Sequence, residues 1–186
     1  MTTELEAAKQ LYREEVKFSA APILDQAIMN WTNAVKFAEI GIRGGLTLNG
    51  AGLLFLPPFL ALLKIELMPV SATVLASLSL FAAGLLASWL VCFFSFFSAN
   101  KMAQALNLQY SSIVGTQARF YFPKWDGAPS KSTIEDHEDA ARDGIKVSRR
   151  FRLASMVAAF LSLALFILGA ALGAWALFRG IGTAIK

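Results

Sequence analysis

The chain has 186 residues, of which 56% are apolar and 16% charged, with a formal net charge of +4, one cysteine and one histidine. This composition is too apolar for an ordinary soluble domain, and it excludes a disulfide scaffold, a zinc site built from cysteine and histidine, and a disordered protein. Three blocks without a charged residue, 44–63, 67–100 and 153–178, together hold 80 residues. The sequence therefore predicts a small integral membrane protein.

The segment 1–39 predicts an amphipathic helical region on the cytoplasmic side of the membrane. Leu5, Tyr12 and Val16 recur at helical spacing and gather on one face. We expect a break near Pro22. Because acidic residues outnumber basic ones here, we expect the segment to pack against other helices rather than to lie on lipid, where a polar face rich in Lys and Arg is typical.

The three apolar blocks predict transmembrane helices. About 20 apolar residues in a helix cross a hydrocarbon core of roughly 30 Å, and each block is that long. In lipid the backbone must pair within the segment, and unbroken apolar runs pair as helices. Pro57 and Pro58 should kink or end the first span in its outer third. The predicted spans are 40–63, 71–97 and 153–178, joined by a short external turn at 64–70 and followed by an external tail at 179–186.

The loop 98–152 predicts a cytoplasmic helical hairpin. Its apolar residues recur at helical spacing up to residue 121, so the second span should continue as a helix beyond the membrane. Residues 122–130 contain two prolines and a glycine and predict the turn. The predicted fold is thus an all-α integral membrane protein, with three transmembrane helices and a small cytoplasmic helical bundle. That bundle is formed by the N-terminal amphipathic helix and by helical extensions of spans two and three.

The second arm of the hairpin begins with candidate capping boxes, in which side chains satisfy free N–H groups of the first turn. Ser132 with Glu135, or Thr133 with Asp136, has the required spacing.

An acidic face follows on the same arm. Asp136, Asp139 and Asp143 fall on one helical face, where oxygen ligands suit a divalent cation. A solvated face with Glu138–Arg142 and Asp143–Lys146 ion pairs is the preferred interpretation, so we expect no metal.

The basic residues predict the orientation. Fourteen of the seventeen Lys and Arg residues lie in residues 1–43 or in the loop 98–152, and three lie on the other side. Cationic flanks stay cytoplasmic, which predicts a bacterial inner-membrane protein with a cytoplasmic N-terminus and an external C-terminus. Arg149, Arg150 and Arg152 should contact lipid headgroups. Since the basic excess lies beside the membrane, nucleic acid is not an expected partner.

The residues needed for catalysis are sparse. The histidine lies in a charged helix, Cys92 lies in a span, and the three charge-free blocks carry no other ionisable group. No glycine-rich phosphate loop follows a strand. We expect neither an enzyme nor a bound cofactor, and buried charges that would mark an ion-coupled transporter are also missing from the sequence of the spans.

Small and polar residues form stripes along the spans, as in helices that associate closely in lipid. Those expected at helix-packing or oligomer interfaces are Gly41, Gly45, Gly52, Gly84, Ser162, Gly169 and Gly173. Those expected to line a pore or make polar contacts between helices are Asn49, Ser77, Ser88 and Ser95.

Three functions are compatible with these patterns. The first is a non-enzymatic scaffold or interaction subunit, homo-oligomeric in membrane lipid, that binds a cytoplasmic or membrane protein through its cytoplasmic helices. The second is an oligomeric pore or membrane-permeabilising effector lined by the uncharged polar residues. The third is an accessory subunit of a larger membrane complex.

Overall fold

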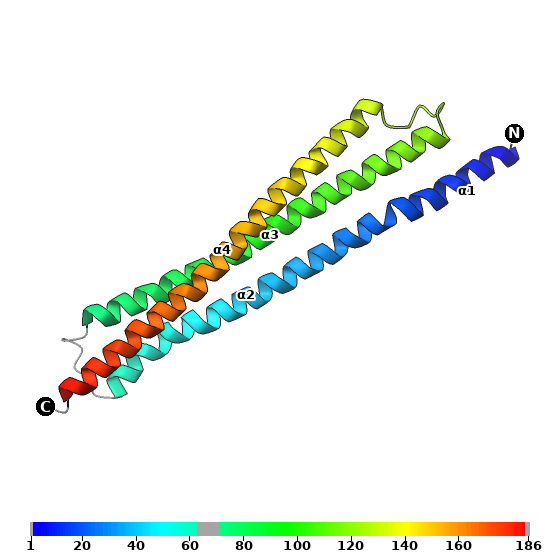
Figure 1. Cartoon of the computed structure of the whole chain (residues 1–186). Helices are drawn as coiled ribbons and strands as arrows, with labels where there is room; N and C mark the ends of the chain where they lie inside the picture. The colour runs from blue at the N-terminus through cyan, green and yellow to red at the C-terminus, as the bar shows by residue number, and fades with distance from the viewer. Residues whose placement is uncertain (1, 63–70, 185–186) are drawn as a thin grey trace. The chain divides into compact units, whose positions relative to one another are not determined.

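The computed structural model describes residues 2–62 and 71–184, which form four α-helices and no strand (Figure 1). The helices are α1 (Thr2–Ser19), α2 (Ala21–Leu62), α3 (Ser71–Tyr121) and α4 (Lys131–Ala184). The predicted all-α fold is confirmed. The turn predicted at 64–70 lies outside the described residues, and α4 continues past residue 179, where the tail was expected to begin.

Three of the described helical stretches are long and apolar enough to cross a membrane. Helices α2, α3 and α4 contain 42, 51 and 54 residues. At 1.5 Å per residue each is at least twice as long as a bilayer core of roughly 30 Å requires. The apolar blocks are therefore parts of longer helices, and the predicted helical continuation of spans two and three is present in α3 and α4.

The chain divides into two compact units, and α2, α3 and α4 each contribute to both. We call residues 36–95 and 152–186 the apolar unit, and residues 1–35 and 96–151 the hairpin unit. The hairpin unit contains α1, the predicted turn at 122–130 and the helical arms on either side of that turn.

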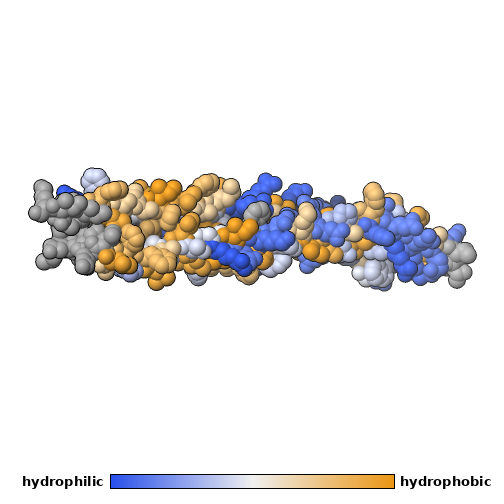
Figure 2. All heavy atoms as spheres, turned by 90° about the horizontal axis from the view of Figure 1, so that it is seen from below, coloured by the Kyte–Doolittle hydropathy of each residue, from blue (hydrophilic) through white to orange (hydrophobic). Residues whose placement is uncertain are grey.

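In the apolar unit the distribution of side chains is the reverse of that in a soluble protein. Large side chains such as Leu54, Trp89 and Phe160 are exposed, whereas several serines and one asparagine are buried. Figure 2 shows that the surface over this unit is mostly orange, the colour of apolar residues. An apolar surface this extensive is suited to lipid contact.

In the hairpin unit, the two long arms pack closely. A Cβ on Gly144 would meet the Cβ of Ala105 at 2.9 Å, so glycine is needed for this approach of α4 to α3. Ser98 and Ser148 each donate a hydrogen bond to the other's backbone carbonyl, at 2.9 and 2.8 Å. These reciprocal bonds satisfy two buried hydroxyls.

The break between α1 and α2 falls at Ala20, two residues before Pro22, as expected. Pro22 occupies the first turn of α2, where a helix has no partner for an N–H group and proline is tolerated. Pro57 and Pro58 lie inside α2 and do not end it, since the helix continues to Leu62.

The N-terminus of α4 corrects the predicted caps. Neither Ser132 nor Thr133 is the cap, because α4 begins at Lys131. Ser130 caps the helix instead: its hydroxyl oxygen accepts a hydrogen bond from the backbone N–H of Thr133 at 3.1 Å. Residues 130–133 include three hydroxyl residues, and spacing alone does not identify the one that ends the turn.

Replacing this cap is expected to loosen the start of α4. Ser130→Ala should cost about 1 kcal/mol, the usual loss for an N-cap serine. Hydrogen exchange of the first-turn amides after Lys131 is expected to speed up about fivefold, as that energy implies. Ser132→Ala is the matched control and should leave exchange near the wild-type rate. Equal effects of the two variants would contradict the assignment of Ser130 as the cap.

Candidate functional site

The six glycines predicted at interfaces all face side chains of a neighbouring helix in the apolar unit. A Cβ on each would come within 3.3 Å of such a side chain, so every one of these positions is closely packed. The pairs are Gly41 with Val91, Gly45 with Ser88, Gly52 with Phe81, Gly84 with Asn49, Gly169 with Phe81, and Gly173 with Leu56 and Ser77. The glycine stripes are thus used for packing within one chain.

A polar network lies at the centre of the apolar unit. The Nδ2 group of Asn49 donates to the Gly45 carbonyl and to the Ser162 hydroxyl, both at 3.1 Å. The hydroxyls of Ser88 and Ser162 are 2.7 Å apart, and they lie 2.9 and 3.0 Å from the carbonyl oxygen of Gly84. The network therefore joins α2, α3 and α4.

One acceptor in this network, the Oδ1 atom of Asn49, lies against Gly84. Asn49 is 1% exposed, and its Oδ1 has no conventional hydrogen-bond donor among the described residues. That oxygen is the atom nearest to the place where Gly84 would carry a Cβ. In glycine a Cα–H bond points there, and Cα–H groups donate weak hydrogen bonds at close helix contacts. Any larger residue at position 84 would collide with this oxygen.

The other two predicted polar residues also join helices within the chain. The Ser77 hydroxyl donates to the Gly169 carbonyl at 2.6 Å, and Ser95 and Ser155 hydroxyls are 2.8 Å apart. Asn49, Ser77 and Ser88 are each at most 1% exposed. Their placement favours contacts between helices of one chain over the lining of a water path between subunits.

The acidic face of α4 is exposed and mostly paired along its own helix. The predicted Asp143–Lys146 pair is confirmed at 2.9 Å, and the hydrogen bond and charge of Lys146 lower the pKa of Asp143. The predicted Glu138–Arg142 pair is wrong. Arg142 lies 3.7 Å from Asp139, and Glu138 accepts a hydrogen bond from Ser112 of α3 instead.

Two further sequence predictions concern charged residues. The side chains of Arg149, Arg150 and Arg152 are exposed, and their contact with lipid headgroups stays a prediction. Within the described ranges, no group of three or more His, Cys, Asp or Glu side chains could hold a metal ion.

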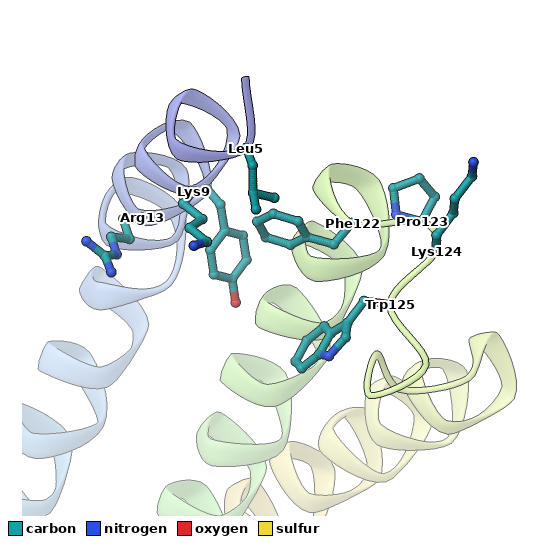
Figure 3. Close-up of a pocket in the computed structure, with 8 residues that line it drawn as sticks. Leu5, Lys9, Arg13, Phe122, Pro123, Lys124 and Trp125 are labelled. Atoms are coloured by element: carbon teal, nitrogen blue, oxygen red, sulfur yellow. The ribbon is translucent and has the colours of Figure 1, made fainter. Parts of the chain in front are cut away.

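The hairpin unit contains a pocket that sequence reasoning missed (Figure 3). Its volume is about 670 Å³, and it lies between α1 and the turn at 122–130. Its lining combines apolar and aromatic side chains with three cations and no acidic residue. The lining residues are Leu5, Lys9, Tyr12, Arg13, Phe122, Pro123, Lys124 and Trp125.

Aromatic contacts hold α1 against the turn and so form the pocket. The ring of Tyr12 meets those of Tyr121 and Phe122 edge-on, with centroids 6.2 and 5.5 Å away. Figure 3 shows Phe122 and Trp125 directed toward α1, with Arg13 and Lys124 extending outward at the margins. Trp125 remains 56% exposed. The signal in the sequence was the aromatic density of the turn, since turns are usually polar.

Comparison with protein-family models, curated proteins and solved structures finds no match.

Substitutions of the packed glycines should separate close helix contact from helix propensity. Gly45→Ala and Gly84→Ala would place a Cβ on Ser88 and Asn49 and are each expected to destabilise the detergent-solubilised protein by about 1–3 kcal/mol. Gly44 and Gly50 have open space at the Cβ position, so Gly44→Ala and Gly50→Ala should stabilise it by about 0.5–1 kcal/mol.

The measurement is thermal or detergent-induced unfolding followed by circular dichroism. If all four alanine variants shift stability in the same direction, the close approach of α2 and α3 described above is incorrect.

Proposed function

We propose that this protein is a non-enzymatic interaction subunit of a bacterial inner membrane. Its apolar unit is the anchor, and its hairpin unit lies in the cytoplasm, where it binds protein through the pocket between α1 and the turn. The external C-terminus and cytoplasmic N-terminus follow from the fourteen Lys and Arg residues on one side of the spans.

The anchor role is supported by the side chains that the apolar unit exposes and buries. Leu54, Leu86 and Phe160 are exposed to about the same extent as residues on a soluble surface, 73, 69 and 70%. In water such a surface would drive aggregation, whereas lipid tails are as apolar as these side chains. Serine and asparagine point inward, where they join the helices by hydrogen bonds.

The pocket is the observation that carries the binding role. Aromatic rings with cationic neighbours are the groups that dominate binding energy at protein interfaces, because they bury large area with few rotatable bonds. Here Tyr12 and Phe122 are fixed by ring contacts, while Trp125 and Leu5 remain about half exposed. A partner would bury these two side chains without first having to order the aromatic cluster.

The burial of the polar residues in the apolar unit weakens the case for a pore. Polar residues that would have to face water between subunits are buried within one chain. The glycine stripes no longer argue for self-association either, since each is packed internally. Support for an oligomer or a protein partner must come from the hairpin unit.

A photo-crosslinking amino acid in place of Trp125 should test the binding role in living cells. With p-benzoylphenylalanine at this position, ultraviolet light is expected to produce a covalent adduct with another polypeptide, because the pocket would hold that polypeptide within reach. Mass spectrometry of the adduct identifies it as a second copy or as a different protein. The matched control places the same amino acid at Asp139, which is exposed on α4 and does not line the pocket.

Adduct formation at Trp125 alone supports the proposed function. Its absence at Trp125 in the native membrane, with the protein correctly inserted, would refute it.

A further inference from the structure

Helix α1 has a second surface opposite the one that lines the pocket. The partly buried residues of α1, including Tyr12 and Val16, lie on the face that packs against the rest of the hairpin unit. On the other side Leu11 and Phe18 are exposed at 54 and 84% and lie two helical turns apart. Glu14 and Glu15 stand between them and are also exposed. We call Leu11, Glu14, Glu15 and Phe18 the outer ridge.

The outer ridge is an unusual surface for a helix in water. Phe18 is the most exposed large apolar side chain among the described residues. It cannot turn into the pocket of its own chain, because the opposite face of the same helix forms one wall of that pocket. An exposed aromatic side chain flanked by carboxylates is matched to an apolar pocket with a cationic margin.

We propose that the pocket receives the outer ridge of α1 from a second copy of this chain. Leu11 and Phe18 of one copy enter the pocket of the next, and Glu14 and Glu15 pair with Arg13 and Lys124 at its margin. This inference rests on the proposed function and names the partner that the same pocket binds.

Charge favours the ridge over the other acidic surface of the chain. The pocket lining holds three cations, of which Lys9 already bonds Glu6 at 2.8 Å and lowers the pKa of that carboxyl. The charge of Arg13 also lowers the pKa of Glu6, but Arg13 forms no ion pair among the described residues, so Arg13 and Lys124 are the cations left to meet a partner's carboxylates. The acidic face of α4 also carries negative charge, but none of the large apolar side chains of residues 131–152 is exposed, so this face has no anchor.

Size and symmetry agree with this occupant. A pocket of about 670 Å³ is in the range that encloses a drug-sized group, so two apolar side chains fit. Because ridge and pocket lie on opposite faces of α1, each copy uses both surfaces with different neighbours. Such head-to-tail contacts give a ring where the rotation between copies closes and an open row of copies where it does not.

The occupant is distinguished from a membrane surface by the charge of α1. A helix that binds anionic lipid carries Lys and Arg around its apolar side chains. The outer ridge carries two glutamates instead, which phosphate headgroups would repel.

A charge-swap series on the full chain in nanodiscs tests the proposal by its self-association constant, measured by mass photometry over a range of protein-to-disc ratios. Glu14→Lys with Glu15→Lys, and separately Arg13→Glu with Lys124→Glu, should each weaken association at least tenfold. A chain with all four changes should recover to within about threefold of wild type, since the reversed charges meet between copies. Lys17→Glu, a cation of α1 outside the pocket lining, is the control and should change little.

Directed disulfide formation gives the geometry directly. In a Cys92→Ser background, a Phe18→Cys chain mixed with a Trp125→Cys chain should form a covalent heterodimer on mild oxidation. Neither chain alone should do so, and a Lys17→Cys chain should not replace the first. The inference would be overturned if the protein is a monomer at all protein densities or if the chain with all four charge changes does not recover association. It would also be overturned if no disulfide forms between the Phe18→Cys and Trp125→Cys chains.

The two proposals fail in different ways. If the crosslinker at Trp125 captures a different polypeptide and no disulfide forms between the Phe18→Cys and Trp125→Cys chains, self-recognition is wrong and the interaction role stands. If a nitroxide at position 18 lies at acyl-chain depth in phosphatidylethanolamine–phosphatidylglycerol vesicles, the ridge binds lipid and self-recognition is wrong.

Discussion

The packing of the apolar unit depends on two contacts between α2 and α3, in each of which a glycine of one helix makes room for a polar side chain of the other. Each helix offers a glycine and, four residues later, a polar side chain: Gly45 and Asn49 on α2, Gly84 and Ser88 on α3. Gly45 makes room for Ser88, and Gly84 makes room for Asn49. Because the pairing runs in opposite directions along the two helices, it requires them to be antiparallel and fixes their register. In lipid, where burial of apolar side chains provides little force between helices, such close contact and hydrogen bonding hold the spans together.

Helix α4 joins this pair through its own small residues. Ser162 bonds both Asn49 and the Gly84 carbonyl, and the Gly169 carbonyl accepts from Ser77. A polar side chain in hydrocarbon is expensive unless it is paired, so each of these bonds excludes registers in which the same group would be left without a partner. The polar network therefore selects one arrangement of the three helices more than it adds net stability. Its residues are buried for this reason, and a conducting role would require them to face water.

The sequence predicts elements well where one local pattern decides them. Charge-free runs give the apolar helices, and two prolines with a glycine place the turn at 122–130. The sequence does not predict features that depend on contacts between residues distant along the chain. Ser130, Ser132 and Thr133 are equivalent as caps until the end of the turn is known, and Glu138 pairs with Ser112 only because α3 and α4 fold together. The pocket was missed for the same reason: Tyr12 and Trp125 are distant in sequence, and no spacing rule relates them.

The proposed binding site lies in the hairpin unit because its exposed aromatic side chains have no partner within the described residues that buries them. The six closely packed glycines of the apolar unit meet side chains of their own chain, and its large exposed side chains are already compatible with lipid tails. The hairpin unit, placed in water under the proposed topology, is different. Exposing Phe18 and Trp125 there costs free energy in proportion to their apolar area, and burying each against a partner would recover a few kcal/mol at most. That amount is small for a single contact, but under the proposed function anchoring in one membrane would raise the effective concentration of the copies and so strengthen their association. Under the proposed function, the membrane anchor would concentrate the copies, and the exposed aromatic residues would give them a surface to recognise.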